Sequence, residues 1–478
     1  MIEKSSQSKR ETRAPQVTGT DDALLGAWAQ TLATRGDEPA IFDTRRRVLL
    51  RFREVEELSR EFETGDQLQN FRAGEIIAIQ IGNHAYWPAL FLACLRRQLV
   101  VLPLEQSISE QERAAALSSC RAAGLITNAG EISRLTTNEP VDWKDCPPVL
   151  LKLTSGTTAA PRAIRFRGAQ LLADARQICL TMGITCADLN FAVIPLSHSY
   201  GFSNLVTPLL GCGVAMVLSN DRLPRAVLDD LARTEATVFP GMPLFFQAFD
   251  EMTKTPPLRK LRLCISAGAP LTRNVADAFR EKFGKPIHSF YGASECGGIC
   301  YDRAAEPKNF DGFVGPAMEG VEVEPLAPNE KSTQLLVRSS AVGDGYFPEA
   351  EPEKLGGGFF RPDDLVEIGD GGVRIVGRVS DLINVAGKKV NPAEVEAQLL
   401  RHEQVKAAIV FGRASSRRNE EVVACVVATN ANEAALLEFC RARLSGWQVP
   451  KRIFFLDELP ANERGKINRR ELARRFAS

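Results

Sequence analysis

The sequence predicts an α/β protein, with a large N-terminal domain of layered α/β subdomains and a small, mobile α+β C-terminal domain. Three observations support this prediction. The chain has 478 residues, which is more than one hydrophobic core usually supports. Between residues 75 and 294, short apolar runs that end at Gly, Pro or Ser alternate with amphipathic stretches. After the glycines at 356–358 the runs become shorter, which indicates a second and smaller unit.

The alternation of apolar runs and amphipathic stretches predicts the helices and strands along the chain. Helices are predicted where apolar residues recur at helical spacing, at 86–97, 109–120, 392–400 and 433–444. Strands are predicted where an apolar run stops at a turn residue, at 75–82, 99–104, 122–128, 149–153, 190–196, 213–219, 236–241, 261–268, 287–294, 371–378 and 407–412. Ligands bind at the carboxyl ends of strands in such sheets, so the turns after these runs are candidate sites.

The predicted domain boundaries follow the shifts in composition. Residues 1–20 are polar and are expected to form a flexible N-terminal tail. The large domain spans 21–377, a hinge covers 378–381, and the small C-terminal domain covers 382–478. The small domain carries 17 basic and 11 acidic side chains. That excess suits a polyphosphate ligand, and it equally suits an arginine-rich solvated surface.

Charge, hydropathy and cysteine usage exclude several classes of protein. Lys+Arg and Asp+Glu both total 59, so the formal net charge is zero and no nucleic-acid partner is expected. The most membrane-like run, 86–95, is too short to cross a bilayer, so no transmembrane segment is predicted. The 11 cysteines are scattered without a zinc-binding spacing, which favours a reduced, cytoplasmic protein.

One stretch stands out as a candidate ligand site. Residues 149–166 read VLLKLTSGTTAAPRAIRF, an apolar run followed by small hydroxyl and glycine residues. The segment Thr154, Ser155, Gly156, Thr157 and Thr158 has little side-chain bulk to keep its backbone from a ligand, as in phosphate-binding loops. Neither a Walker loop nor a Gly-x-Gly-x-x-Gly turn occurs in the chain. A polar connection between two strands is the alternative interpretation.

This segment, followed by Pro161 and a basic residue, resembles the phosphate loop of the adenylate-forming superfamily, which includes acyl-CoA and aryl-CoA synthetases, adenylation domains and luciferases. The family loop reads Thr-Ser-Gly-Thr-Thr-Gly-x-Pro-Lys-Gly. This chain has Ala159, Arg162 and Ala163 where the family has glycine, lysine and glycine. Arginine keeps the positive charge and adds donors, so phosphate binding is compatible with the change. Ala159 restricts the loop more than glycine would.

Six further segments resemble the same family in the same order. They read IPLSHSYGF at 194–202, SAGAPL at 266–271, YGASE at 291–295, FFRPDDL at 359–365, GRVSDLINVAGKKVNPAEVE at 377–396 and LPANERGKINRREL at 459–472. Each segment taken alone has an ordinary structural explanation. Seven segments in family order and spacing are not expected by chance.

The resemblance implies a role for each matching residue. His198 stands between ATP and the carboxylate substrate, Glu295 holds Mg²⁺, and Lys466 is the catalytic lysine. The implied ATP- and CoA-binding residues are Thr154, Ser155, Gly156, Thr157, Thr158, Arg162, Gly268, Ala269, Pro270, Tyr291, Gly292, Ser294, Asp364, Arg378, Gly387 and Lys389. Before Asp364, the chain has Pro362 and Asp363 where the family has Thr-Gly.

The implied reaction activates a carboxylic acid with ATP. The carboxylate attacks the α-phosphorus, pyrophosphate leaves, and the thiol of CoA then takes the acyl group from the acyl adenylate. A cation about 4 Å from the moving charge contributes roughly 4 kcal/mol at an effective dielectric near 20. Lys466, Mg²⁺ at Glu295, and Arg162 with the loop donors are the three expected sources. In the family, the C-terminal domain then rotates, withdraws the lysine and brings up the Gly387 segment.

The acid is expected to be fatty or aromatic. The implied pocket residues, mostly apolar, are Tyr200, Phe239, Gly241, Met242 and Ser266. The aspartate with which amino-acid-activating domains hold an amino group is missing from LSHSYGF. Two alternatives stay open: loading of an acyl carrier protein through its phosphopantetheine, and a non-catalytic nucleotide- or acyl-binding homologue.

Overall fold

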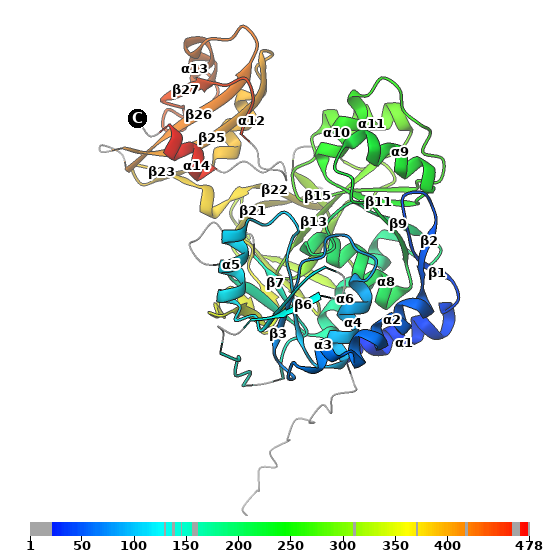
Figure 1. Cartoon of the computed structure of the whole chain (residues 1–478). Helices are drawn as coiled ribbons and strands as arrows, with labels where there is room; N and C mark the ends of the chain where they lie inside the picture. The colour runs from blue at the N-terminus through cyan, green and yellow to red at the C-terminus, as the bar shows by residue number, and fades with distance from the viewer. Residues whose placement is uncertain are drawn as a thin grey trace, which may run out of the picture.

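The computed structural model describes residues 22–128, 131–135, 139–144, 146–154, 161–308, 312–369, 371–415, 419–460 and 469–476. It has the predicted α/β class, with a large body and a smaller C-terminal unit that stands off the body in Figure 1. Five of the predicted site residues lie outside the described residues: Ser155, Gly156, Thr157, Thr158 and Lys466.

The first large sheet of the body has eight strands in the order β14-β13-β12-β11-β9-β10-β1-β2. These strands are β1 (Pro39–Phe42), β2 (Val48–Arg51), β9 (Leu189–Ala192), β10 (Ala215–Leu218), β11 (Val238–Gly241), β12 (Leu263–Ser266), β13 (Ile287–Ala293) and β14 (Gly297–Tyr301). Neighbouring strands are parallel except for the edge pairs β1–β2 and β13–β14. Burial on both faces explains why the central strands read as continuous apolar runs.

The second large sheet has seven strands in the order β18-β8-β7-β4-β3-β5-β6. These are β3 (Ile76–Ile79), β4 (Val100–Pro103), β5 (Gly124–Asn128), β6 (Glu131–Arg134), β7 (Leu150–Leu153), β8 (Ala163–Phe166) and β18 (Gly345–Phe347). At one edge β7, β8 and β18 are antiparallel, so the candidate phosphate loop connects two strands of a hairpin. The strand β18 reaches this hairpin from a point about 180 residues further along the chain.

The helices of the body cover both sheets. They are α1 (Ala23–Arg35), α2 (Phe52–Thr64), α3 (Asp66–Gln69), α4 (Trp87–Arg96), α5 (Glu110–Ser119), α6 (Gly168–Met182), α7 (Ser199–Gly201), the π-helix η1 (Phe202–Val206), α8 (Thr207–Cys212), α9 (Pro224–Thr234), α10 (Pro243–Glu251) and α11 (Arg273–Phe283). Figure 1 shows α1, α2, α4 and α8 grouped low in the body and α9 to α11 grouped at the upper right.

The predicted core helix at 86–95 is confirmed, because every residue from Trp87 to Leu95 in α4 is buried. The rings of Trp87 and Phe91 pack edge-to-face on Phe202, with centroids 5.7 and 5.2 Å away. Full burial of such a side chain contributes about 1.5–3 kcal/mol to stability. No helix among the described residues is both long enough and apolar enough to span a bilayer.

Two small sheets, most of whose strands the sequence did not predict, follow the body. One contains β15 (Phe313–Gly315), β22 (Gly372–Arg378) and β21 (Asp364–Gly369), and the other contains β16 (Val321–Pro325), β17 (Leu335–Ser339), β20 (Phe359–Phe360) and β19 (Leu355–Gly356). They position Asp364 and Arg378 at the junction with the C-terminal unit.

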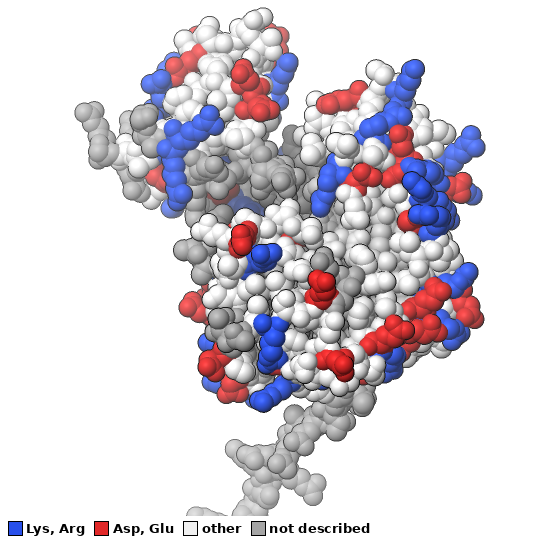
Figure 2. Space-filling view, in the orientation of Figure 1, with Lys and Arg blue, Asp and Glu red and all other residues white. Residues whose placement is uncertain are grey.

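The C-terminal unit has hydrophobic clusters of its own, separate from the main cluster of the body. Its elements are the 3₁₀ turn η2 (Val379–Asp381), β23 (Ile383–Val385), β24 (Lys388–Val390), α12 (Pro392–Leu399), β25 (Val405–Ser415), β26 (Asn419–Ala428), α13 (Glu433–Arg441), β27 (Arg452–Phe455) and α14 (Arg469–Arg475). On the face in Figure 2, basic and acidic side chains are interspersed over this unit and the body.

Candidate active site

The carboxyl ends of three parallel strands define a candidate ligand-binding edge. In β11, β12 and β13, Gly241 is in register with Ser266, and Ser266 is in register with Ser289. The turn at 268–270, the predicted adenine shelf, follows β12 directly. Gly268 has φ +85°, a conformation that favours glycine. The fold therefore brings the predicted shelf and two predicted pocket residues to one edge of the sheet.

The candidate phosphate loop is closed at its base. β7 and β8 pair with Leu153 opposite Ala163. The Thr154 N–H donates to the Arg162 carbonyl at 2.9 Å, and the Thr154 hydroxyl donates to the same oxygen at 3.2 Å. These two bonds fix the start and the end of the loop relative to each other.

Arg162 belongs to a polar cluster beside this loop. Its guanidinium lies 4.2 Å from the centre of the Tyr346 ring and forms an ion pair with Glu351. The Tyr346 hydroxyl donates to Glu295 Oε1 at 3.0 Å. Burial raises the pKa of Glu295 above its usual range, and the bond from Tyr346 opposes that rise. We call Glu295, Tyr346, Arg162 and Glu351 the outer network.

Three predicted nucleotide-binding residues meet at the start of β21. Asp364 accepts a hydrogen bond from the Tyr291 hydroxyl at 2.7 Å and another from Arg378 Nε at 2.8 Å. Asp364 and Arg378 lie opposite each other on antiparallel β21 and β22, which explains their ion pair. Burial and the adjacent Asp364 raise the pKa of Tyr291 well above its usual value, so its hydroxyl stays a neutral donor.

The chain departs from the family pattern at Pro362 and Asp363, but Asp364 keeps its contacts with Tyr291 and Arg378. The Pro362 carbonyl accepts from Gln334 at 3.0 Å, and the Asp363 carboxylate pairs with Lys354 at 2.8 Å. Both replacement residues have partners that hold this turn.

His198 begins the short helix α7 and accepts the Tyr200 N–H on Nδ1 at 3.1 Å. The next residue, Ser199, donates to the Ser294 hydroxyl at 2.8 Å. A Cβ at Gly201 would lie 2.0 Å from the Pro195 carbonyl oxygen, so this turn requires glycine. The fold therefore joins the predicted His198 and 291–295 segments.

Of the other predicted acid-pocket residues, Gly241 lies beside Tyr200. The Tyr200 hydroxyl lies 3.4 Å from the Gly241 carbonyl, and the centre of the Tyr200 ring lies 5.9 Å from that of Phe290. Phe239 is fully buried in β11, and Met242 packs against the same hydrophobic cluster. Among the described residues, the buried Ser266 hydroxyl has no hydrogen-bond partner.

A second polar cluster lies deeper in the body. Lys152 in β7 is 5% exposed, and its ammonium donates to the Ser203 hydroxyl at 3.2 Å. Lys152 and the Ser203 hydroxyl favour the ionised form of the buried Asp174, which also accepts the Gly298 N–H at 3.1 Å. Burial lowers the pKa of Lys152 and raises the pKa of Asp174. We call Lys152, Ser203 and Asp174 the inner network.

The inner network also fixes the backbone near Glu295. Gly297 has φ +70°, and a Cβ there would lie 2.0 Å from Asp174 Oδ1. Only glycine fits between this carboxylate and the turn. The network therefore joins the strand before the phosphate loop, the helix after His198 and the β13–β14 hairpin.

The predicted thiol-site residues occupy a hairpin of the C-terminal unit. Ala386 and Gly387 both have positive φ, 51° and 86°, between β23 and β24. This is the two-residue turn that antiparallel strands favour. Lys388 lies 3.7 Å over the Trp447 ring, and the predicted Lys389 is exposed beside it.

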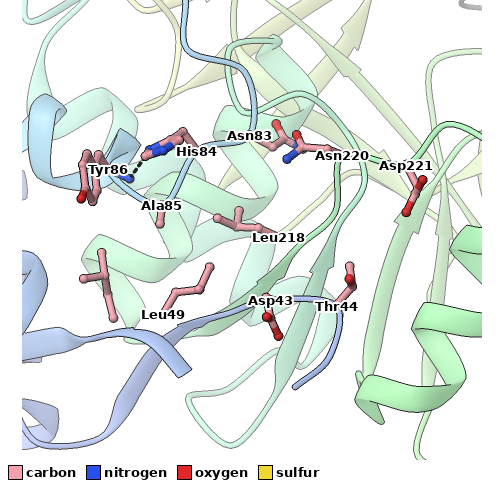
Figure 3. A pocket seen from close by; sticks show the side chains of 11 residues that line it. Asp43, Thr44, Leu49, Asn83, His84, Ala85, Tyr86, Leu218, Asn220 and Asp221 are labelled. Carbon is pink, nitrogen blue, oxygen red and sulfur yellow. Dashed lines mark hydrogen bonds between the residues drawn. The ribbon is translucent and has the colours of Figure 1, made fainter. Parts of the chain in front are cut away.

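A surface cavity of about 560 Å³ has the lining that Figure 3 shows. It is lined by none of the predicted site residues. Two of its polar side chains have partners: Asn83 makes hydrogen bonds to the backbone of Ala192, Ile194, Leu196 and Ser219, and Asp43 accepts from its own turn. The cavity lies where loops from the eight-stranded and the seven-stranded sheets meet.

Sequence reasoning missed Tyr346, Glu351 and the inner network. Tyr346 reaches Glu295 only because β18 pairs with β8, which no local pattern reveals. Lys152 did leave a signal, since it is a charged residue inside an apolar strand.

The buried Tyr291 on the Asp364 carboxylate and the Gly268 turn at the strand edge have the arrangement expected of an adenylate-forming enzyme. A family model described as AMP-binding enzyme matches residues 28–347, and one described as AMP-binding enzyme C-terminal domain matches 394–466. The chain belongs to the AMP-binding enzyme family.

Known relatives match most of the chain. A feruloyl-CoA synthase of Amycolatopsis sp is 30% identical over 442 residues, covering 85% of this chain and 89% of that protein. An oxalate–CoA ligase of Arabidopsis thaliana is 27% identical over 465 residues, with the same coverage. ATP-bound MatB of Rhodopseudomonas palustris superposes with a TM-score of 0.82 at 22% identity, covering 94% of this chain and 98% of that chain; this likeness concerns the fold.

These matches confirm the predicted fold class and enzyme class, an AMP-forming acid–thiol ligase that uses ATP and CoA. The roles of individual residues stay predictions.

Proposed function

We propose that this enzyme activates an aromatic carboxylic acid with ATP and Mg²⁺ and transfers the acyl group to CoA. The convergence of Tyr291, Asp364 and Arg378 at one end of the strand edge carries this proposal. Asp364 suits the ribose hydroxyls, which donate to a carboxylate, and Arg378 orients that carboxylate. The feruloyl-CoA synthase relative and the Phe290 ring beside Tyr200 favour an aromatic acid over a fatty one.

The groups around the loop offset the charge of the triphosphate. Thr154 and Arg162 hold the ends of the candidate loop together, and the Arg162 guanidinium lies beside it as a cation for the phosphates. His198 separates the acid from the phosphates, and the Gly268 turn lies along the base. Glu295 fits Mg²⁺, because this ion usually takes one or two protein carboxylates and completes its shell with phosphate and water oxygens. Bound there, Mg²⁺ would neutralise charge on the phosphates.

We place the hinge at 378–381, with 21–377 and 382–478 as the domains on either side. Support comes from the separate hydrophobic clusters of the two parts and from the short η2 turn between them. A movable second part explains how Lys466 can assist adenylation and then leave. The Gly387 turn and Lys389 would then face the thiol.

CoA is favoured over a carrier protein as the acceptor because the relatives that match most of the chain are CoA ligases. The eleven cysteines are all free thiols, which supports the cytoplasmic location predicted from the sequence.

The test is acid-dependent exchange of labelled pyrophosphate into ATP over fatty, aromatic and amino acids, followed by detection of thioester with CoA. Exchange that is strongest with aromatic acids, and thioester formed with CoA alone, is the expected result. Exchange without thioester would favour the carrier-protein alternative. A lack of exchange with every acid would favour a non-catalytic homologue.

A further inference from the structure

The inner network contains a buried cation that adenylation does not use. We propose that Lys152 is a specificity-determining residue that recognises a neutral oxygen substituent, a hydroxyl or ether, on the ring of the aromatic acid. This inference rests on the proposed function, because it presumes that an acid occupies the pocket around Tyr200.

The inner network is joined to the surroundings of Tyr200 in two ways. Ser203, which accepts from Lys152, lies three residues after Tyr200 on the continuous segment formed by α7 and η1. Gly298, whose N–H binds Asp174, has its Cβ position 3.0 Å from the Phe290 ring. Phe290 is itself the ring neighbour of Tyr200. The segment between Tyr200 and Ser203 includes a π-helix, an irregularity that is frequent at functional sites.

Lys152 has spare hydrogen-bonding capacity. An ammonium carries three N–H donors, and among the described residues it has one hydrogen-bond acceptor, the Ser203 hydroxyl. Its other close neighbours are the rings of Phe166 and Phe202, at 4.7 and 5.7 Å from their centres. Buried polar groups normally have partners. An oxygen on the acid would supply the missing acceptor.

The charge balance selects a neutral oxygen. Lys152 and Asp174 already compensate each other's charge. A second carboxylate on the acid would add a buried charge without a partner, which is unfavourable where water is excluded. A hydroxyl or ether accepts a hydrogen bond without that cost. The aromatic rings around the network favour a ring as the carrier of this oxygen.

The experiment compares three acids in pyrophosphate exchange: cinnamate, 4-hydroxycinnamate and 4-carboxycinnamate. For the wild-type enzyme, we expect kcat/KM for 4-hydroxycinnamate to exceed that for cinnamate about tenfold, the worth of one buried hydrogen bond. The double variant Lys152→Met/Asp174→Asn removes both charges together, so it leaves no buried charge unpaired even where Lys152→Met alone fails to fold. For the double variant, we expect the ratio of kcat/KM for 4-hydroxycinnamate to that for cinnamate to fall to about one. Lys331→Met, at a side chain that is 87% exposed, is the matched control and should keep the wild-type ratio.

Each other outcome overturns a definite part of the inference. A wild-type ratio near one, or a double variant that keeps the wild-type ratio, removes the role of Lys152. If the enzyme prefers 4-carboxycinnamate and this preference depends on Lys152, then Lys152 recognises an anion and not a neutral oxygen. Lack of exchange with every acid removes the proposed function as well, whereas exchange without preference removes only this inference.

Discussion

The outer and inner networks are built from similar groups but differ in access and in charge balance. In the outer network, the side chains of Arg162 and Glu351 are 30% and 37% exposed. In the inner network, Lys152 and Asp174 are 5% and 4% exposed. The outer network sets one guanidinium against two carboxylates, whereas the inner network sets one ammonium against one carboxylate.

This difference distinguishes charges that bind the triphosphate from charges that stabilise the fold and contact the acid. A network with excess negative charge needs cations from elsewhere before it can receive a triphosphate. A buried pair with balanced charges needs no further cation, and it can accept only an uncharged group of the acid. We therefore assign ATP to the outer network and the acid to the inner one.

The largest expected effect concerns the cation that the outer network lacks. Lys466→Ala should abolish acyl adenylate formation, because the triphosphate then loses the cation carried by the C-terminal unit. Thioester formation from a supplied acyl adenylate should be largely retained, since the lysine has left by that step. Both half-reactions can be followed separately. Equal loss of both would contradict domain alternation.

Glu295→Gln should lower kcat/KM for adenylation about 100-fold or more, because an isosteric amide keeps the shape but loses the charge that holds Mg²⁺. The loss should be the same for every acid. Pyrophosphate exchange against Mg²⁺ concentration measures it, with Glu306→Gln at an exposed carboxylate as control. An acid-dependent loss would mean that the outer network also contacts the acid.

Lys152→Met should destabilise the body by about 3–5 kcal/mol, because it leaves Asp174 buried without its cation. The pKa of Asp174 is raised in the folded state, so folding binds its proton and the free energy of unfolding declines as pH rises through that pKa. The deficit should therefore be smaller at acid pH. Urea unfolding at two pH values tests this, and Lys152→Met/Asp174→Asn should recover most of the loss. A deficit independent of pH would contradict the pairing.

Tyr346→Phe should lower adenylation about tenfold at mildly acid pH and less at alkaline pH. The lost hydroxyl stabilised the ionised form of Glu295, so the pKa of this carboxyl rises further above 4.5. Glu295 must be ionised to act, and the acid limb of the pH–rate profile should therefore move to higher pH. An unchanged profile would show that Tyr346 only packs.

The smallest expected effect comes from the exposed end of the outer network. Glu351→Gln removes the carboxylate that competes with triphosphate for Arg162, and exposed ion pairs contribute about 0.2–1 kcal/mol. The KM for ATP should fall by about two- to fivefold. Glu349→Gln, at an exposed neighbour, should leave it unchanged. A higher KM for ATP would mean that Glu351 helps to bind the nucleotide.

Local patterns account for what could be predicted. The apolar run of β7 and the small residues after it identify a strand and a loop without further information. The helix α4 was recognisable because its apolar residues recur along a single segment. The seven family-like segments supplied the candidate site, because each is short and continuous in the chain.

Long-range pairing accounts for what could not be predicted. Arg162 and Glu351 are 189 residues apart, and they meet because β18 joins the edge of the β7–β8 hairpin. The pairing of Asp364 with Arg378 depends on the register of two strands in a small sheet that the sequence did not reveal. Lys152 stood out in the sequence, but its partners Ser203 and Asp174 come from two separate helices.

The most direct test places one variant of each network in the same assay. Pyrophosphate exchange of Glu295→Gln and of Lys152→Met/Asp174→Asn is measured with cinnamate and 4-hydroxycinnamate. The account predicts that the Glu295 variant loses rate equally with both acids, and that the Lys152 variant loses the preference between them. A changed preference in the Glu295 variant, or an unchanged one in the Lys152 variant, would contradict it.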